Sequence, residues 1–318
     1  MSGGGVDARL LVLIPIFEDW AAAGLLLADL DRALGDRNLR AAVWLVDDGS
    51  MEPAPRSLGA RPYQALESIS VLALRRNLGH QRAIAIGLAA AHEQFRPTAV
   101  VVMDGDGEDA PDDVPRLVEA LRANGGLSIV FAERRRRTES ALFKAFYAAY
   151  RWGHRLLTGV AVRVGNFSIV PAAQLERIVV VSELWNHYSA AVFQAKLPHE
   201  SIPTSRRRRL IGTSQMHFTD LVLHGMRALS VYSELIGVRL LVATVVMAGV
   251  LIASFLVVLG MSLSPATVAV TGLIALLLCQ TLASTVAFVF LVLHGRSQPL
   301  FIPNRDYAHF VRDLTSLS

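Results

Sequence analysis

Two long uncharged stretches constrain the fold of this chain more than any other feature of its sequence. No charged residue occurs from Leu240 to Leu263, and none occurs again from Ala266 to Leu293. Each stretch exceeds the roughly 20 residues that a helix needs to cross a bilayer core. The sequence therefore predicts two transmembrane helices. The alternative, a pair of buried core helices, would require long soluble helices without a polar face.

Basic residues flank these stretches on one side only. Arg239 precedes the first stretch, and His294 and Arg296 follow the second, whereas the connecting turn carries no charge. Because Lys and Arg favour the cytoplasmic side, we expect the cytoplasmic (inner) membrane, with the larger domain in the cytoplasm. The expected parts are a cytoplasmic domain over 1–215, a juxtamembrane amphipathic helix over 216–237, a transmembrane hairpin over 238–294 and a cytoplasmic tail over 295–318.

The juxtamembrane helix is expected from apolar residues at helical spacing. These residues are Phe218, Leu221, Val222, Leu229, Tyr232 and Ile236. The pattern is typical of a helix that lies at the membrane interface. The alternative is an ordinary surface helix packed on the domain.

The first part of the chain alternates short apolar runs with segments of helical spacing. The expected strands are Leu10–Pro15, Ala41–Val46, Ile69–Leu74, Ala99–Met103 and Leu127–Ala132, and the expected helices include Trp20–Leu34, Gln81–Phe95, Asp112–Arg122 and Ser182–Lys196. Runs rich in Val, Ile and Leu suit strands buried on both faces of a mostly parallel sheet. The alternation predicts an α/β layered domain. The last helix, with a cap at Ser182, carries Trp185 and Tyr188 either into a ligand pocket or into the core.

Acidic residues follow two of the expected strands. The second strand ends in Asp47-Asp48-Gly49-Ser50, and the fourth ends in Asp104-Gly105-Asp106. Carboxylates at this edge of the sheet, together with diphosphate oxygens, could complete the oxygen shell that Mg²⁺ or Mn²⁺ prefers. An ordinary acidic turn is the alternative. A calcium loop counted from Asp104 fails, because its sixth position is Asp109 rather than Gly. No GxGxxG or GxxxxGK[ST] motif supports a dinucleotide fold or a P-loop.

Taken in order, the motifs resemble those of glycosyltransferase family 2, in its polyprenyl-phosphate branch. The matching segments are Pro15–Asp19 for P-x-Y-N-E, Val46–Ser50 for V-D-D-G-S, Arg75–Gln81 for R-N-x-G-x-x, Met103–Asp106 for D-A-D, Glu108–Pro111 for Q-D-P-P, Gly165–Phe167 for G-D-F and Arg209–Gln215 for R-x-x-G-x-S-K. The departures are Phe17 for Tyr, Glu18 for Asn, Glu108 for Gln, Asn166 for Asp and Gln215 for Lys. They concern the identity of the sugar and the acceptor more than the type of reaction.

The resemblance implies a GT-A fold and a metal-dependent, inverting transfer from a UDP- or GDP-sugar to a polyprenyl phosphate. It assigns the nucleotide sugar to Pro15, Phe17, Asp19, Asp47, Asp48, Arg76, Asn77, Gly79, His80, Asp104, Gly105 and Asp106. It assigns the metal to Asp104 and Asp106, catalysis to Asp104, Asp106, Asp109 and Arg209, and the acceptor phosphate to Arg134, Arg137, Asn166, Arg207, Arg209 and Ser214. It is also compatible with a homo-oligomer.

A phosphate acceptor changes the need for a general base. Its second pKa of about 6 leaves it largely anionic at neutral pH, so it could attack without a dedicated base. If a base is needed, the candidates are Asp109 and Glu183. Other hypotheses are a different membrane lipid or glycan acceptor, or a catalytically silent membrane adaptor of the same fold.

Two arginine runs, Arg134–Arg137 and Arg206–Arg209, contribute to a formal net charge of +4. They either capture phosphate or serve solubility and attraction to anionic lipid headgroups. Nucleic-acid binding is not expected, since no aromatic residues interleave with the charge.

Overall fold

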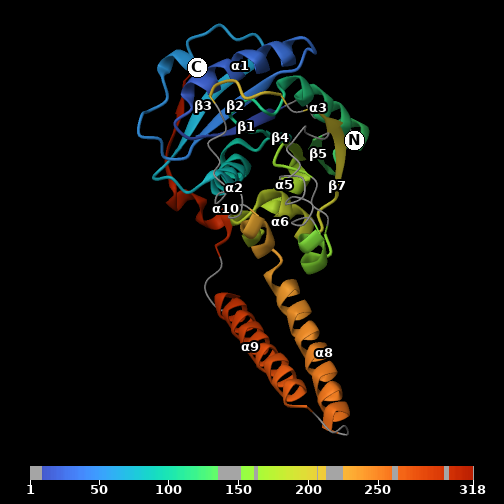
Figure 1. The fold of residues 1–318 in the computed structure, drawn as a ribbon. Coiled ribbons are helices and arrows are strands. Elements are labelled where there is room, and N and C mark those ends of the chain that lie inside the picture. Colours follow the sequence, from blue (N-terminus) through green and yellow to red (C-terminus); the bar gives the residue numbers. More distant parts are fainter. Residues whose placement is uncertain are drawn as a thin grey trace. The chain divides into compact units, whose positions relative to one another are not determined.

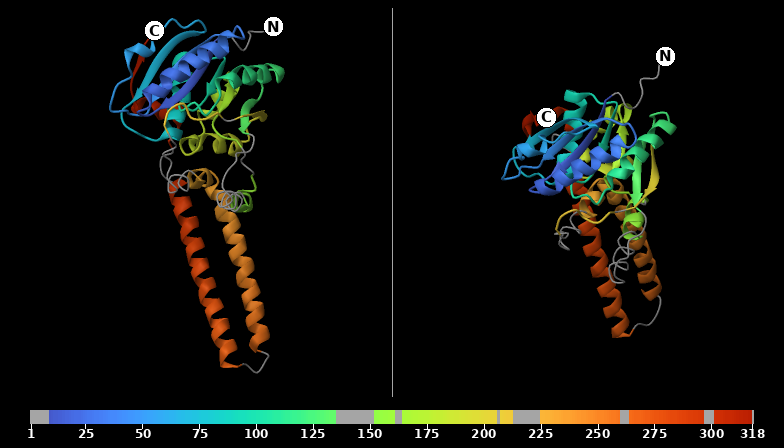
Figure 2. Two further views of the ribbon diagram at one scale, coloured as in Figure 1. Left: turned by 45° about the horizontal axis from the view of Figure 1, so that its top comes forward. Right: turned by 90° about the horizontal axis from the view of Figure 1, so that it is seen from above.

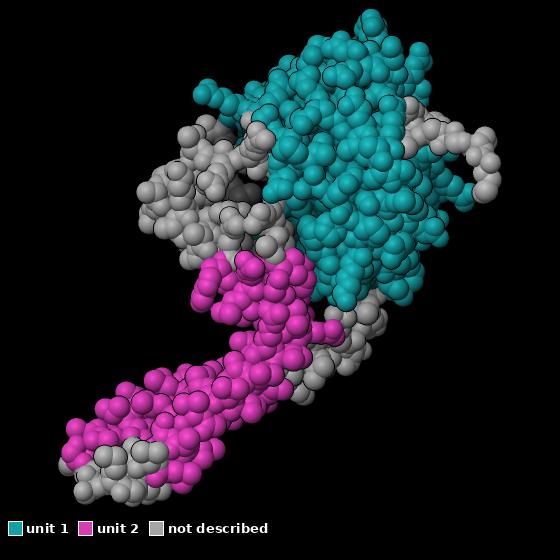
Figure 3. All heavy atoms as spheres, turned by 90° about the vertical axis from the view of Figure 1, so that its right-hand side faces the viewer, with its two compact units in different colours: residues 1–139, 162–231, 301–318 teal, residues 140–161, 232–300 magenta. Residues whose placement is uncertain are grey.

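The computed structural model describes residues 9–134, 152–160, 164–205, 207–212, 225–259, 264–296 and 301–317. The chain divides into two compact units (Figure 3). The first unit comprises residues 1–139, 162–231 and 301–318, and the second comprises residues 140–161 and 232–300.

The first unit is built on a mixed, mostly parallel sheet in the order β7-β5-β6-β4-β1-β2-β3-β8 (Figure 1). Its strands are β1 Leu10–Ile16, β2 Ala41–Asp47, β3 Leu66–Leu74, β4 Ala99–Val102, β5 Ile129–Arg134, β6 Ser168–Pro171, β7 His199–Thr204 and β8 Val311–Ser316. Strands β4, β1, β2 and β3 run parallel, and β6 and β8 are antiparallel to their neighbours. The five expected strands are confirmed, whereas β6, β7 and β8 were not expected.

Helices cover both faces of this sheet (Figures 1 and 2). They include α1 Trp20–Gly35, α2 His80–Ala90 with a π-helical turn Ala91–Phe95, α3 Val114–Ala123, α5 Ala172–Ile178 and α6 Tyr188–Gln194. Strand β1 shows why both faces must be covered. Its residues Val12 and Ile14 belong to the core beneath α1 and α3, whereas Leu11 and Leu13 belong to the core beneath α2. Successive side chains of a strand point to opposite faces, so an all-apolar strand needs two layers of helices.

The single helix expected over Ser182–Lys196 is wrong. A 3-10 turn covers Ser182–Trp185, and a separate helix, α6, begins at Tyr188. Between them His187 adopts an extended backbone with φ −162°, and its ring nitrogen accepts a hydrogen bond from the Ala190 N–H at 3.4 Å. An N-capping residue must leave helical geometry to reach the first turn, so the helix cannot run through His187.

The C-terminal segment returns to the first unit. Its elements are α10 Pro303–Asp306, a 3-10 turn Tyr307–His309 and strand β8, which pairs with β3 at the edge of the sheet. The rings of Phe301 and Phe310 contact Trp185, with centroids 4.0 and 5.1 Å from its ring. The stretch that the sequence suggested as a tail therefore contributes a strand and part of an aromatic cluster.

The second unit contains the two apolar helices, α8 Ser233–Leu259 and α9 Pro265–Arg296. Within them, Ser233–Ser254 and Ala266–Phe288 are long and apolar enough to cross a membrane, with mean hydropathies of 2.5 and 2.0. The hydroxyls of Thr244 and Thr285 lie 3.2 Å apart between the helices. The expected pair of apolar helices is confirmed. Of the juxtamembrane helix expected over 216–237, residues 225–230 are helical, 231–232 form a turn and 233–237 already belong to α8, whereas 216–224 lie outside the described residues.

Candidate active site

The candidate site lies where β1, β2 and β4 end. These three strands are parallel neighbours, so their carboxyl ends meet at one edge of the sheet. Asp19 follows β1, Asp48 follows β2 and Asp104 follows β4. In open α/β sheets, ligands bind beyond this edge.

The turn after β2 is held by hydrogen bonds to its own two carboxylates. Asp48 accepts from the backbone N–H groups of Leu78 and Gly79, both at 2.8 Å, and Asp47 accepts from the Ser50 N–H at 2.9 Å. Burial raises the pKa of Asp48, and the two backbone donors act in the opposite direction. Asp48 therefore fixes the loop that carries Asn77 and His80.

Gly49 allows this turn to pack against the same loop. Its φ is +74°, and a Cβ atom there would lie 2.5 Å from the backbone nitrogen of Asn77. Only glycine adopts this conformation at little cost and leaves room for the neighbouring backbone. The side chains of Arg76 and Asn77 themselves are exposed.

The turn after β4 leaves its carboxylates more open. The side chains of Asp104 and Asp106 are 24% and 23% exposed. Asp106 accepts from the Glu108 N–H, and the buried Asp109 accepts from the Asp104 N–H, both at 2.9 Å. Asp109 thus shapes the turn that presents Asp104.

Gly105 is required by packing against β1. A Cβ atom there would lie 2.5 Å from Ile16 Cδ1 and 2.9 Å from the carbonyl oxygen of Pro15.

Pro15 is tolerated within β1 although proline has no backbone N–H. The pairing of β1 with β4 ends at Leu13, so no N–H of Pro15 is needed on the side of β1 that faces β4.

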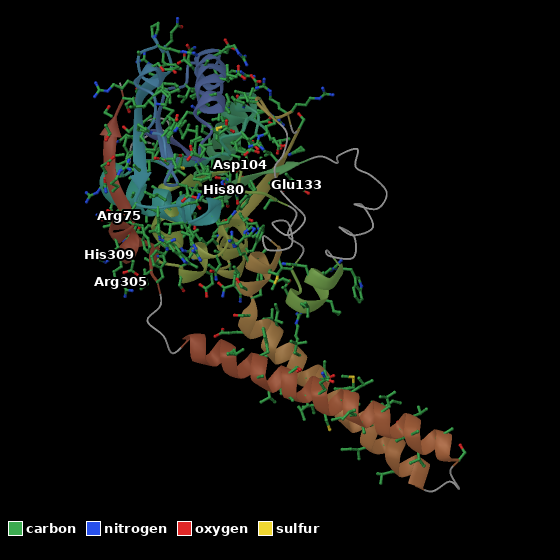
Figure 4. The ribbon with its side chains drawn as sticks, turned by 60° about the vertical axis from the view of Figure 1, so that its left-hand side comes forward. Arg75, His80, Asp104, Glu133, Arg305 and His309 are labelled. Carbon is green, nitrogen blue, oxygen red and sulfur yellow. The ribbon has the colours of Figure 1, made fainter. Side chains whose placement is uncertain are left out.

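His80 connects the loop after β3 with the turn after β4. Its Nε2 lies 3.0 Å from Asp104 Oδ1 (Figure 4). The same nitrogen lies 3.1 Å from Asn166 Nδ2. Burial works against the charged imidazole, but the carboxylates of Asp104, Asp109 and Asp106 outweigh it and raise the pKa of His80.

The orientation of Asn166 follows from a chain of hydrogen bonds. The Tyr188 N–H donates to Gln81 Oε1 at 2.8 Å, so the Gln81 amide nitrogen must donate to Asn166 Oδ1 at 3.1 Å. This leaves the Asn166 N–H group facing His80. Without a proton, His80 Nε2 can accept a hydrogen bond from the Asn166 amide. With a proton, it can donate to Asp104. The nitrogen therefore bonds to one of these two partners at a time. Gln81 was missed by the sequence analysis, and no local pattern marks it.

Arg209 is brought to the site by a segment that lies along the turn after β4. The N–H groups of Arg207 and Leu210 donate to the carbonyls of Glu108 and Asp106, both at 3.0 Å. The Arg209 guanidinium then lies 3.6 Å from Asp19 and 4.0 Å from Asp106. Its neighbour Arg207 instead pairs with Asp29 at 2.9 Å.

The remaining predicted residues are placed as follows. The side chain of Phe17 is half exposed, and Glu183 accepts a hydrogen bond from the Ser182 hydroxyl at 3.2 Å. The backbone of Arg134 ends β5, and Arg137 and Ser214 lie outside the described residues.

The turn after β4 offers a metal ion two carboxylates, those of Asp104 and Asp106, and not a full set of protein ligands. Among the described residues, no group of three or more His, Cys, Asp or Glu side chains could hold a metal. Mg²⁺ is commonly held by one or two carboxylates that substrate phosphates and water complete. The partly exposed pair Asp104 and Asp106 fits that mode.

The chain is similar to known proteins in sequence and in fold. The model of the family "Glycosyl transferase family 2" matches residues 11–167. Undecaprenyl-phosphate 4-deoxy-4-formamido-L-arabinose transferase of Pseudomonas aeruginosa (strain LESB58) is 30% identical over 204 residues, which cover 59% of this chain and 56% of that protein. The enzyme of the same name from Klebsiella pneumoniae (strain 342) is 25% identical, covering 67% and 64%. The chain thus spans less than two thirds of the length of either relative.

The fold also matches a solved structure. Glucosyl-3-phosphoglycerate synthase of Mycobacterium tuberculosis, in complex with Mn²⁺, UDP and glucosyl-3-phosphoglycerate, superposes with a TM-score of 0.50. The identity is 16%, and the match covers 73% of this chain and 83% of that one. This similarity concerns the fold alone.

Proposed function

Residues 11–167 belong to glycosyl transferase family 2, and from this premise we propose that the chain transfers a sugar from a nucleotide diphosphate sugar to a polyprenyl phosphate. The transfer is metal-dependent, inverts the anomeric carbon and takes place at the cytoplasmic face of the inner membrane. The names of the relatives from Pseudomonas and Klebsiella support the lipid acceptor. The two long apolar helices support a membrane location.

The observation that carries this proposal is the meeting of Asp104, Asp106, Asp19 and Arg209 at one sheet edge. Three carboxylates and a guanidinium at the carboxyl ends of parallel strands suit a charged ligand such as a nucleoside diphosphate. An acidic turn without ligand chemistry would not need a second segment to bring an arginine across to it.

Asp104 and Asp106 would hold a divalent ion, Mg²⁺ or Mn²⁺. The diphosphate of the donor and water molecules would supply the other ligands. When bound, the ion neutralises charge on the departing diphosphate. Arg209 lies beside Asp19 and Asp106. Its forked N–H donors would bind oxygens of the same diphosphate that the ion contacts. Asp48 acts indirectly, by holding the loop of Asn77 and His80.

The acceptor side needs no strong base in this proposal. A phosphate monoester with a pKa near about 6 is already anionic at neutral pH, so the protein has to orient it rather than deprotonate it. Asp109 is buried and occupied by the Asp104 N–H, which suits a structural role better than proton transfer.

The test is transfer of radiolabelled sugar to undecaprenyl phosphate by purified full-length protein in detergent. A panel of UDP- and GDP-sugars is offered with Mg²⁺ or Mn²⁺. Label entering the lipid phase with one donor class and disappearing with a chelator is the expected result. Absence of label with every donor, although donor binding is measurable, would contradict the polyprenyl phosphate acceptor.

A further inference from the structure

A small cavity lies beside the candidate site, and its lining includes none of Asp19, Asp104, Asp106 and Arg209. It encloses about 30 Å³ and is lined by Gly79, Gln81, Arg82, Trp185, Asn186 and Arg227. Such a volume holds one or two water molecules. It therefore has room for one or two oxygens of a phosphate group whose remainder lies outside the cavity, and it is too small for a sugar ring or a nucleobase.

Two arginines approach this cavity from different parts of the chain. The Arg82 guanidinium carbon lies 4.8 Å from the centroid of the Trp185 ring. Arg227, from the helical residues 225–230, reaches Gly79 so closely that a Cβ atom there would lie 3.7 Å from its Nη1. Burial lowers the pKa of Arg82, and the nearby charges of Arg227 and Arg76 lower it further. Like charges are thus gathered here at an energetic cost.

The surroundings offer these arginines little compensating charge. None of the ion pairs found among the described residues involves Arg76, Arg82 or Arg227. Asp48 attracts Arg82 from a distance, but its oxygens already accept two backbone hydrogen bonds. Helix α2 begins beside the cavity with no side-chain cap and no acidic residue in its first turn. Its positive end therefore adds to the potential of the arginines.

The indole beneath Arg82 is held in place. Trp185 packs on Phe301 and Phe310 of the C-terminal segment that returns to the sheet. A guanidinium that lies on a fixed aromatic face keeps its donors directed outward with less loss of side-chain entropy. This support distinguishes the cavity from a chance cluster of surface arginines.

We propose that Arg82 and Arg227, with Trp185 beneath Arg82, form a site for the phosphate head group of a membrane lipid, next to the sugar-transfer centre. Polyprenyl phosphate as the source of this head group rests on the proposed function, and an anionic phospholipid of the bilayer is the other source. Guanidinium groups bind phosphate through paired, charge-assisted hydrogen bonds. Arg227 also precedes helix α8 by only a few residues of sequence. Arg209 is not part of this site, because its guanidinium faces Asp19 and Asp106.

The experiment measures calorimetric binding of citronellyl phosphate, a short prenyl phosphate, to the full-length protein in phosphatidylcholine nanodiscs. Arg82→Gln and Arg227→Gln should each raise the dissociation constant about tenfold, and the double variant more, because each removes a charge-assisted contact. Arg40→Gln is the matched control, since Arg40 is exposed just before β2; it should stay within about twofold. Citronellol, which lacks the phosphate, should not bind. UDP affinity should be the same in all variants.

Two conservative variants guard against a folding artefact. Arg82→Lys keeps the charge but loses the fork, and Trp185→Phe keeps an aromatic ring for Phe301 to contact; each should weaken binding by about threefold to fivefold. Adding phosphatidylglycerol to the nanodisc separates the two sources. If phosphatidylglycerol lowers the affinity of wild type for citronellyl phosphate, it occupies the same site, and the occupant is anionic phospholipid. If it does not compete, the occupant is the prenyl phosphate.

The proposal is overturned if the folded double variant binds citronellyl phosphate as wild type does, or if the variants lose UDP rather than prenyl phosphate. Wild-type protein that binds neither citronellyl phosphate nor inorganic phosphate would overturn it as well. Sugar transfer is measured on the same samples. Wild type that transfers no sugar but loses its phosphate binding on Arg82→Gln would contradict the proposed function and leave this site standing.

Discussion

The turns after β2 and β4 look alike in the sequence, yet their carboxylates have different surroundings. Asp47 and Asp48 are only 2% and 3% exposed, and both accept hydrogen bonds from backbone N–H groups. Asp104 and Asp106 are instead partly exposed, with 24% and 23% of their side chains open to solvent, and they face His80 and Arg209. The carboxylates of the first turn hold neighbouring loops, whereas those of the second are partly open to solvent. Two similar acidic motifs thus differ in their surroundings, and the proposed function gives the chemical role to the second.

The largest effect is expected from Asp106→Asn. It removes one of two carboxylates available to a metal, so sugar transfer should fall by at least about 100-fold. Stability should change little, because the side chain is partly exposed and its amide oxygen can still accept from Glu108 N–H. The lipid-phase transfer assay and a thermal unfolding midpoint measured on one preparation check both statements. If Asp106→Asn also lowered the unfolding midpoint enough to account for the lost activity, Asp106 would be a structural residue like Asp48.

Asp48→Ala should act in the opposite way, through the fold. It leaves the N–H groups of Leu78 and Gly79 without their acceptor, which should cost about 2–4 kcal/mol of stability. Thermal unfolding of the detergent-solubilised protein measures this, with Asp106→Ala as the matched control. Equal midpoints for the two variants would show that Asp48 does not hold the loop.

A pair of glycines sharpens the same comparison. Gly49 and Gly126 have similar φ values, +74° and +71°, but a Cβ at Gly49 would meet the backbone of Asn77, and nothing lies within 4 Å at Gly126. Both alanine variants carry the strain of a left-handed residue, about 1 kcal/mol. Gly49→Ala should therefore lose about 1–2 kcal/mol more than Gly126→Ala. Equal unfolding midpoints would mean that the turn after β2 is not tightly packed against the following loop.

The smallest effect is expected from Arg209→Lys. The charge near Asp19 and Asp106 remains, but the forked geometry is lost, so kcat/KM should fall by about threefold to tenfold. Arg207→Lys is the matched control, since Arg207 pairs with Asp29 away from the turn. An equal loss of kcat/KM in both variants would place Arg209 outside the site.

The strands that the sequence revealed are those buried on both faces. An apolar run such as that of β1 or β2 can be read without knowing its partners. Strands β7 and β8, at the two edges of the sheet, have largely exposed residues, and an edge strand needs no apolar run. β6 has only four residues. Its assignment depends on the pairing with β4 and β5, which is a property of the whole fold.

The acidic motifs of the candidate site were also readable, because strand ends and short motifs are local features. The partners of these residues were not. The link from Tyr188 through Gln81 and Asn166 to His80 joins residues about one hundred positions apart. The approach of Arg227 to Arg82 is likewise a consequence of tertiary packing. The break at His187 was missed because Ser is a common capping residue and His is not. The hydrogen bond from the Ala190 N–H to the His187 ring is seen only in the structure.

The most direct test is sugar transfer to undecaprenyl phosphate by wild type, Asp106→Asn and Asp48→Asn, with Mn²⁺ and with chelator, normalised to folded protein. The account predicts metal-dependent transfer in wild type, a loss of at least about 100-fold in Asp106→Asn at an unchanged unfolding midpoint, and a lowered midpoint in Asp48→Asn. Asp106→Asn activity within about threefold of wild type would contradict the claim that the turn after β4 is the one that carries the chemistry.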